Sequence, residues 1–176
     1  MKEFLQGLLP RIVPPGQEFL LIPHEGKRDL EASIPRKLAA WRDPHARFVI
    51  IRDQDSADCK VVKERLVAMC GRAKKAALVR IACHELEAWY VGDLRAVDRV
   101  FGTNLAVQQN KSRYRDPDRL GSPSQELAKL LPGFAKVSAA RKLGLVMDPE
   151  NTRSRSFAVF VRGIRGLASE EGQMGG

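Results

Sequence analysis

Cysteine is scarce in this chain of 176 residues, and its scarcity excludes two kinds of scaffold. Cys59, Cys70 and Cys83 are an odd number, and no two of them have CxxC spacing. The sequence therefore offers neither a disulfide framework nor a zinc cluster, and its cysteine usage is typical of a protein in a reducing cytosol. We expect the three thiols to occupy buried apolar positions, as free cysteines often do.

The sequence also lacks a membrane-spanning run, a signal peptide and two common catalytic motifs. No apolar run approaches the roughly 20 residues that span a bilayer. The first ten residues include Lys2 and Glu3 and lack the apolar core of a signal peptide. Neither a GxxxxGK[ST] phosphate loop nor a GxSxG nucleophile elbow occurs. We therefore predict a cytoplasmic protein that contacts no membrane, has no P-loop and does not use covalent catalysis.

Positive charge is abundant. Thirty Lys and Arg residues stand against 21 Asp and Glu residues, which gives a formal net charge of +9. This excess favours a polyanionic partner, because each neutralised phosphate releases counterions. A basic surface that only keeps the protein soluble would have the same composition. Nucleic acid is the predicted partner, and the composition leaves DNA and RNA equally open.

The order of apolar patterns indicates the fold class. Helical spacing alternates with short apolar runs, and such runs are typical of buried strands. The expected helices cover 4–12, 30–41 and 61–70, and the expected strands cover 19–22, 48–51 and 77–82. This alternation predicts an α/β fold with a mostly parallel sheet flanked by helices.

The second half of the chain is mainly helical. Helical patterns occur over 85–102, 127–131 and 157–167, and a polar stretch over 103–124 predicts a long loop. We expect the tail from Ser169 to fray. We divide the chain into an α/β core at 1–102 and a loop with a helical extension at 103–176, packed on the same domain.

An Asp-x-Asp motif follows the clearest predicted strand. Asp53 and Asp55 come directly after the apolar run 48–51, at the carboxyl end of a parallel strand, where open α/β sheets bind ligands. Carboxylates with this spacing can converge on Mg²⁺ or Mn²⁺, which bind oxygen ligands and substrate phosphates. The alternative is that they only form a turn, followed by Asp58 as the N-cap of the next helix.

A second acidic pair follows the next strand. Glu85 and Glu87 come shortly after the run 77–82, so we expect them at the same edge of the sheet as the Asp-x-Asp motif. Glu85 is the nearer to the strand end and is the predicted third metal ligand. Both glutamates can instead favour a helix start through the helix dipole.

Basic residues near these acids are candidate phosphate contacts. Lys27 and Arg28 follow Gly26 and lie just before the helix predicted over 30–41, so they could meet a phosphate near its N-terminus. Arg52 immediately precedes Asp53 and is the third candidate.

Three segments together resemble a known family. They are Glu25–Leu30, Asp53–Cys59 and Glu85–Tyr90, with later similar stretches at Lys136–Arg141 and Asn151–Phe157. The likeness is to small bacterial Toprim-like proteins of a domain-of-unknown-function family. Those proteins are often encoded beside AAA-type ATPases, as in the OLD (overcoming lysogenisation defect) phage-defence systems.

The resemblance implies a Toprim fold with Mg²⁺ held by a glutamate after the first strand and by a later Asp-x-Asp. Asp53 and Asp55 match the later pair. The first strand and its glutamate would precede the helix at 4–12, so we expect both to be missing, whereas Glu25 follows the next strand. An uncovered sheet edge would then favour a homo-oligomer.

Two functions follow from these expectations. The first is a metal-dependent nuclease module that acts with an AAA/OLD-type ATPase. In it Asp53, Asp55, Glu85 and Glu87 are catalytic, and Asp53, Asp55 and Glu85 hold the metal. The alternative is a non-catalytic subunit with a degenerate site that binds nucleic acid or the ATPase.

Overall fold

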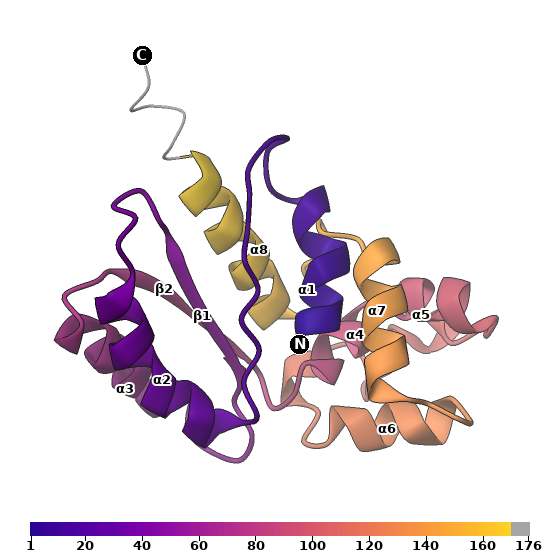
Figure 1. Ribbon diagram of the computed structural model, residues 1–176. Coiled ribbons are helices and arrows are strands. Elements are labelled where there is room, and N and C mark those ends of the chain that lie inside the picture. The colour runs from indigo at the N-terminus through magenta and orange to yellow at the C-terminus, as the bar shows by residue number, and fades with distance from the viewer. Residues whose placement is uncertain (170–176) are drawn as a thin grey trace.

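The computed structural model describes residues 1–169 and shows an α/β protein with a small sheet (Figure 1). Strands β1 (Phe48–Asp53) and β2 (Ala77–Ala82) pair in parallel, from Phe48 opposite Ala77 to Asp53 opposite Ala82. Helix α3 (Cys59–Arg72) connects them, and Asp58 caps it by accepting hydrogen bonds from the Lys60 and Val61 amides. The two strands and this cap confirm the sequence predictions.

Helices cover both faces of the sheet. Helices α2 (Lys27–Ala40) and α3 lie on one face, and α1 (Lys2–Leu8) and α8 (Arg155–Ser169) lie on the other (Figure 1). Successive residues of β1 point to opposite faces. Its even-numbered apolar residues therefore join a cluster with α2 and α3, and its odd-numbered ones join the main core. This burial on both sides explains why the strand reads as a continuous apolar run.

The remaining elements are helical. They are η1 (Leu9–Arg11), α4 (Glu87–Gly92), α5 (Leu94–Phe101), η2 (Ala106–Gln108), η3 (Pro117–Arg119), α6 (Pro123–Leu130) and α7 (Lys136–Val146). The helix expected over 85–102 is divided at Asp93, whose carboxylate caps α5 by accepting the Ala96 amide at 3.0 Å. The predicted loop contains η2 and η3, and α7 was not predicted.

One predicted strand is wrong. Residues 19–22 are extended but belong to no strand, and the sheet that the structure describes has only β1 and β2. Phe19, Leu20 and Ile22 are 42%, 69% and 42% exposed. An apolar run becomes a strand only when a neighbouring strand pairs with it, and a groove separates this segment from β1.

The main core joins both halves of the chain. The Trp89 ring lies 5.8 Å from Phe4 and 5.2 Å from both Phe157 and Phe160, measured between ring centroids. Trp89, Tyr90 and the inner face of α8 are therefore core residues. Within residues 1–169, none of the helices has the length and apolar character needed to cross a membrane. The tail predicted to fray lies outside the described residues from position 170 onward.

Candidate acidic site at the carboxyl end of the sheet

Asp53 is the centre of the candidate site. It ends β1, and its Oδ1 atom is buried without a hydrogen-bond partner among residues 1–169. Burial, followed by the nearby carboxylate of Glu87, raises the pKa of Asp53 to about 6, although the Met1 amino group and the Leu86 amide oppose this rise. An unpaired buried carboxyl oxygen is costly, so this atom marks a place in the described part of the chain where a further interaction would be stabilising.

Glu87 lies beside Asp53 at the start of α4. It is 5% exposed, and its Oε1 atom is 3.5 Å from Lys136 Nζ. Lys136 begins α7 and also lies 3.7 Å from Glu85. Lys136, which is distant in sequence, thus offsets the negative charge of both Glu85 and Glu87, which follow β2.

The Glu85 carboxylate, unlike that of Asp53, has a hydrogen-bond partner for each of its two oxygens. Its two carboxylate oxygens accept hydrogen bonds from the Ser124 amide at 2.9 Å and the Ser124 hydroxyl at 3.0 Å. Burial alone would raise the pKa of Glu85, but these bonds and Lys136 together lower it. Glu85 is therefore ionised and fixed against the N-terminus of α6.

Tyr90 completes the buried part of the site. Its hydroxyl oxygen has no hydrogen-bond partner among the described residues. Burial, together with Glu87 and Asp53, holds the pKa of Tyr90 well above its usual value. The tyrosine is therefore a neutral hydroxyl beside two carboxylates, with its own bonding capacity unused.

Asp55 turns away from this cluster. The chain adopts a positive φ of 58° at Asp55, and its amide donates to the His84 carbonyl at 2.9 Å. The Asp55 carboxylate lies 3.2 Å from Lys27 Nζ and 3.4 Å from Arg52 Nη2. Asp53 and Asp55 therefore have different partners, and the turn between them separates the two halves of the Asp-x-Asp motif.

The three residues predicted to contact phosphate, which are Arg52, Lys27 and Arg28, have different environments. Arg52 has a buried side chain that pairs with Glu31 at 2.8 Å and donates to the Asp53 carbonyl at 2.9 Å. Lys27 and Arg28 are exposed at the start of α2. Arg52 is thus an internal link between α2 and β1, whereas Lys27 is exposed but paired with Asp55, and Arg28 is exposed.

Among residues 1–169, no group of three or more His, Cys, Asp or Glu side chains is arranged to hold a metal ion. The predicted set of Asp53, Asp55 and Glu85 is therefore not brought together. The structure instead joins Asp53 with Glu87. Two side chains, Tyr90 and Lys136, were missed as site residues, because an apolar pattern and a distant helix give no sign that they reach β1.

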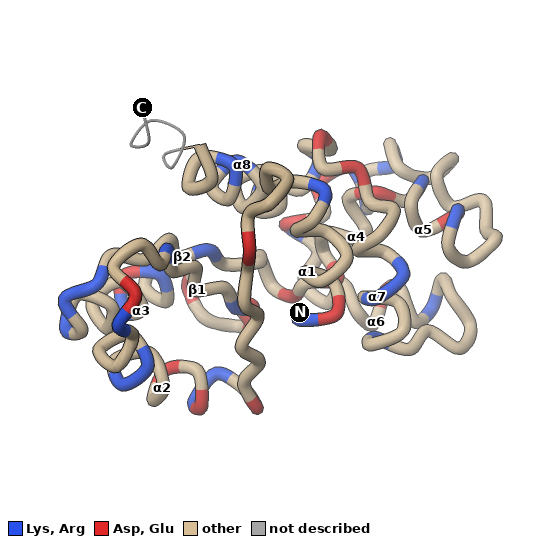
Figure 2. Tube along the Cα trace, turned by 45° about the horizontal axis from the view of Figure 1, so that its top comes forward, with Lys and Arg blue, Asp and Glu red and all other residues tan. Residues whose placement is uncertain are grey.

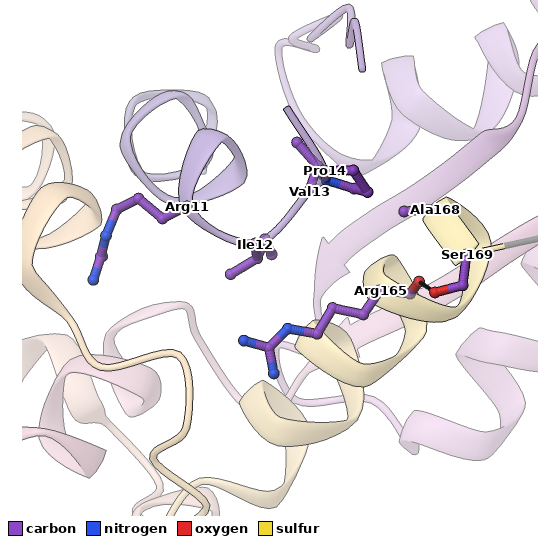
Figure 3. A pocket seen from close by; sticks show the side chains of 7 residues that line it. All are labelled: Arg11, Ile12, Val13, Pro14, Arg165, Ala168 and Ser169. Carbon is purple, nitrogen blue, oxygen red and sulfur yellow. Dashed lines mark hydrogen bonds between the residues drawn. The ribbon is translucent and has the colours of Figure 1, made fainter. Parts of the chain in front are cut away.

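A second hollow lies far from these acids, between the end of η1 and the end of α8 (Figure 3). It has a volume of about 360 Å³. Arg11 points away from it and donates to the Gly144 and Met147 carbonyls, while Arg165 pairs with Glu150. Both arginines that line the hollow already have hydrogen-bond or ion-pair partners. The hollow is therefore a weaker candidate for a functional site than the acidic cluster around Asp53.

Fold and site together define an α/β protein with a desolvated carboxylate pair at the carboxyl end of a parallel sheet. The chain belongs to the DUF4276 family, a domain of unknown function, whose family model matches residues 1–165. No curated protein matches the chain, and no solved structure does.

Proposed function

We propose that this protein is a Toprim-like, divalent-metal-dependent phosphodiester-cleaving module in which Asp53 and Glu87 hold the metal. The observation that supports this proposal most strongly is the buried, unpaired Oδ1 atom of Asp53 beside the Glu87 carboxylate. Two neighbouring carboxylates in a desolvated place repel each other, and a cation removes that repulsion. The donor set, which consists of hard oxygens, fits Mg²⁺ or Mn²⁺.

The chain's own residues have separate roles in this proposal. Asp53 and Glu87 bind the ion, and Glu85 positions Lys136. When bound, a divalent ion supplies Lewis-acid activation of a phosphodiester oxygen or of a water. Lys136 is 58% exposed, so its ammonium group can also meet a phosphate.

A basic surface on α3 supports a nucleic-acid substrate. Figure 2 shows Lys and Arg gathered on α3 and the adjoining turn. The exposed basic residues there are Lys60, Lys63, Arg65, Arg72 and Lys74. Glu64 is the opposing acid within α3, so the helix has a net positive charge that attracts phosphates. An AAA/OLD-type ATPase remains the proposed partner.

A non-catalytic binding subunit is the second candidate. It is favoured by the engagement of Asp55 with Lys27 and Arg52, which leaves Asp53 and Glu87 as the carboxylates of the buried site within the described chain. In this case the basic surface of α3 would bind nucleic acid without cleaving it.

Calorimetric titration with Mn²⁺ tests the site directly. The parent is compared with Asp53→Asn, Glu87→Gln and Asp55→Asn, and Glu150→Gln is the matched control because Glu150 is an exposed carboxylate paired only with Arg165. We expect the first two substitutions to weaken binding by about 100-fold or more, and the last two to leave it unchanged. Loss of Mn²⁺ binding in Asp55→Asn would instead indicate that the Asp-x-Asp pair, Asp53 and Asp55, holds the metal.

Hydrolysis of bis(p-nitrophenyl) phosphate with Mn²⁺ tests the activity without a choice between DNA and RNA. Turnover by the parent that disappears in Asp53→Asn supports the enzyme. Mn²⁺ binding without turnover of this diester or of DNA and RNA would favour the binding subunit. Absence of both binding and turnover would refute the metal site.

A further inference from the structure

The long loop between α5 and α6 lies beside the segment that leads into α8. Arg153 donates to the side-chain oxygen of Asn110 at 2.9 Å, and the Ser154 hydroxyl donates to Asp118 at 2.7 Å. Because one contact lies at each end of the stretch 110–119, this part of the loop runs along the start of α8. Neither segment has a role in the proposed metal site.

Buried polar side chains hold this loop in one conformation. The side-chain amide of Gln109, a residue that is 7% exposed, donates to the Val91 and Tyr114 carbonyls at 2.9 and 3.2 Å. The Tyr114 hydroxyl donates to Glu126 at 2.7 Å, and both of these residues are buried. Buried polar groups whose hydrogen bonds are satisfied specify a single arrangement. The side chains on the outside of the loop are therefore preorganised.

The two adjoining segments are strongly basic. Residues 110–119 and 151–155 contain six Lys or Arg residues and two Asp residues. Asp116 pairs with Arg119 at 3.1 Å, and Asp118 accepts hydrogen bonds from serines at the start of α8. Both acids thus have partners within the protein, and a net positive charge remains on this surface.

Three cations of this surface are unengaged. Lys111, Arg115 and Arg155 are exposed, and their side chains have no hydrogen-bond or ion-pair partner within residues 1–169. Like charges that are grouped on a surface repel one another and attract a polyanion. Each phosphate that such a cation neutralises also releases counterions, which favours binding further.

This basic surface reaches the end of the sheet where the acidic site lies. Helix α8 begins beside the carboxyl ends of β1 and β2 (Figure 1). The amide of Cys83, which follows β2 directly, donates to the Ser156 hydroxyl at 3.4 Å. Asp53 is paired with Ala82, the last residue of β2. Arg155 is thus next in sequence to a residue that contacts the end of the sheet.

The surface has cations but lacks an aromatic ring that a base could stack on. Tyr114, the only aromatic residue of the two described segments, is 5% exposed. Sites for single strands combine cations with exposed aromatic rings. Lysine and arginine alone contact phosphates, which are most densely arranged along a double helix.

We propose that residues 110–119 and 151–155 form a docking surface for double-helical nucleic acid. Lys111, Arg115 and Arg155 bind phosphates of the backbone, and the bases are not read. The hydrogen bonds between the two segments keep these side chains together, and the duplex lies at the carboxyl end of the sheet. This inference rests on the nucleic-acid substrate of the proposed function but not on its metal site.

Fluorescence anisotropy of a labelled DNA duplex tests the surface in EDTA, over a range of salt concentrations. The parent is compared with the double variant Arg115→Gln, Arg155→Gln, which removes two side chains that make no internal contact. The matched control is Arg42→Gln, Arg47→Gln. It removes the same charge from exposed arginines just before β1, at the opposite end of the sheet.

We expect the variant Arg115→Gln, Arg155→Gln to bind the duplex at least about tenfold more weakly at about 0.1 M salt. The slope of log K against log salt concentration should fall in magnitude by about 1.8, which corresponds to two phosphates. The control should bind within about threefold of the parent, because its charges are remote and screened. Arg115→Lys, Arg155→Lys keeps both charges and should also bind within about threefold. A single strand of the same length should bind the parent at least about tenfold more weakly than the duplex.

Equal losses in the two glutamine variants would overturn the inference, because they would reflect net charge alone. Absence of duplex binding by the parent would overturn it as well. A loss confined to Lys60→Gln, Lys63→Gln would transfer the contact to α3. Equal affinity for the single strand would refute the assignment to a double helix.

Failure of the metal site is distinguished by the calorimetric titration. Duplex binding in EDTA by a chain that binds no Mn²⁺ would refute the metal site and support this surface. Mn²⁺ binding by a chain that binds no duplex would refute this surface and leave the metal site in place.

Discussion

Gly144 in α7 lies so close to Phe4 in α1 that a Cβ atom at position 144 would be 2.3 Å from the Phe4 carbonyl oxygen. Gly7 faces it, and a Cβ atom there would be 2.8 Å from the Gly144 carbonyl carbon. The backbones of the two helices are thus in direct contact. This contact fixes the position of α1, and with it the Met1 amino group near Asp53.

Gly144→Ala should destabilise the protein by about 1–3 kcal/mol, because the added methyl group meets backbone atoms that cannot move aside alone. Gly71→Ala is the matched control. Gly71 lies in α3 with open space around its Cα, so alanine there should stabilise the helix by about 0.5–1 kcal/mol. Urea unfolding measures both changes. Equal effects of the two substitutions would contradict the close contact between α1 and α7.

The ionisation of Asp53 should reduce stability as pH rises. The pKa of Asp53 is about 6 in the folded chain, against about 3.9 when unfolded, so the folded state holds this proton more tightly. The contribution of this group is therefore most favourable below about pH 4 and is lost as pH rises to about 6, by roughly 3 kcal/mol at most.

The amide side chain of the Asp53→Asn variant cannot ionise, so this variant should not lose stability through position 53 as pH rises. In metal-free urea unfolding, the variant and the parent should be similar near pH 4, and the variant should be more stable by about 1–3 kcal/mol near pH 7.5. Stability curves that run parallel across this range would show that Asp53 has an ordinary pKa.

Lys136→Met should destabilise the metal-free protein, because it leaves the buried Glu87 carboxylate without its cation. We expect a loss of roughly 1–3 kcal/mol, since Lys136 is itself half-exposed. Lys142→Met is the control in the same helix, where Lys142 is exposed. If Mn²⁺ binds at Glu87, saturating Mn²⁺ should reduce the loss; a loss that is the same with and without Mn²⁺ would argue against that ligand.

Asp118 should be required for the attachment of the long loop. Its carboxylate accepts the Ser154 hydroxyl at 2.7 Å and the Ser156 amide at 2.7 Å, and the Ser156 hydroxyl accepts the Trp89 indole N–H at 2.9 Å. Asp118→Ala removes the acceptor of the Ser154 hydroxyl and of the Ser156 amide, and it should cost about 2–4 kcal/mol and speed proteolysis of the loop.

The neighbouring Asp116 provides the comparison for that substitution. It is half-exposed and pairs with Arg119 within the same turn at 3.1 Å. Asp116→Ala should change the free energy of unfolding by less than about 1 kcal/mol. Similar proteolysis rates for the two variants would exclude a special role for the Asp118 network.

The sequence predicted the parts of the fold that depend on local pattern. β1 and β2 are continuous apolar runs of β-formers, and Asp58 caps α3 as its position indicated. Helix α7 was not predicted; it contains Gly144, a residue of low helix propensity that the close contact with Phe4 requires. Packing against α1 outweighs that propensity.

The sequence predicted which segments meet at the carboxyl end of the sheet, but not which of their carboxylates lie together. Asp53 and the turn after β2 do meet at the carboxyl end of the sheet, as parallel pairing requires. The spacing of Asp53 and Asp55 suggested convergence, but the positive φ at Asp55 breaks the strand alternation and directs that carboxylate to Lys27. Lys136 reaches the site from a helix about fifty residues away, which no local pattern reveals.

The second hydrophobic cluster, formed by α2, α3 and the even-numbered face of β1, is separate from the main core. Its members, such as Leu30, Ile34 and Leu66, are buried against one another and meet the rest of the protein across the sheet. Such an arrangement makes α2 and α3 a subglobal unfolding unit, able to open while the aromatic core around Trp89 stays closed.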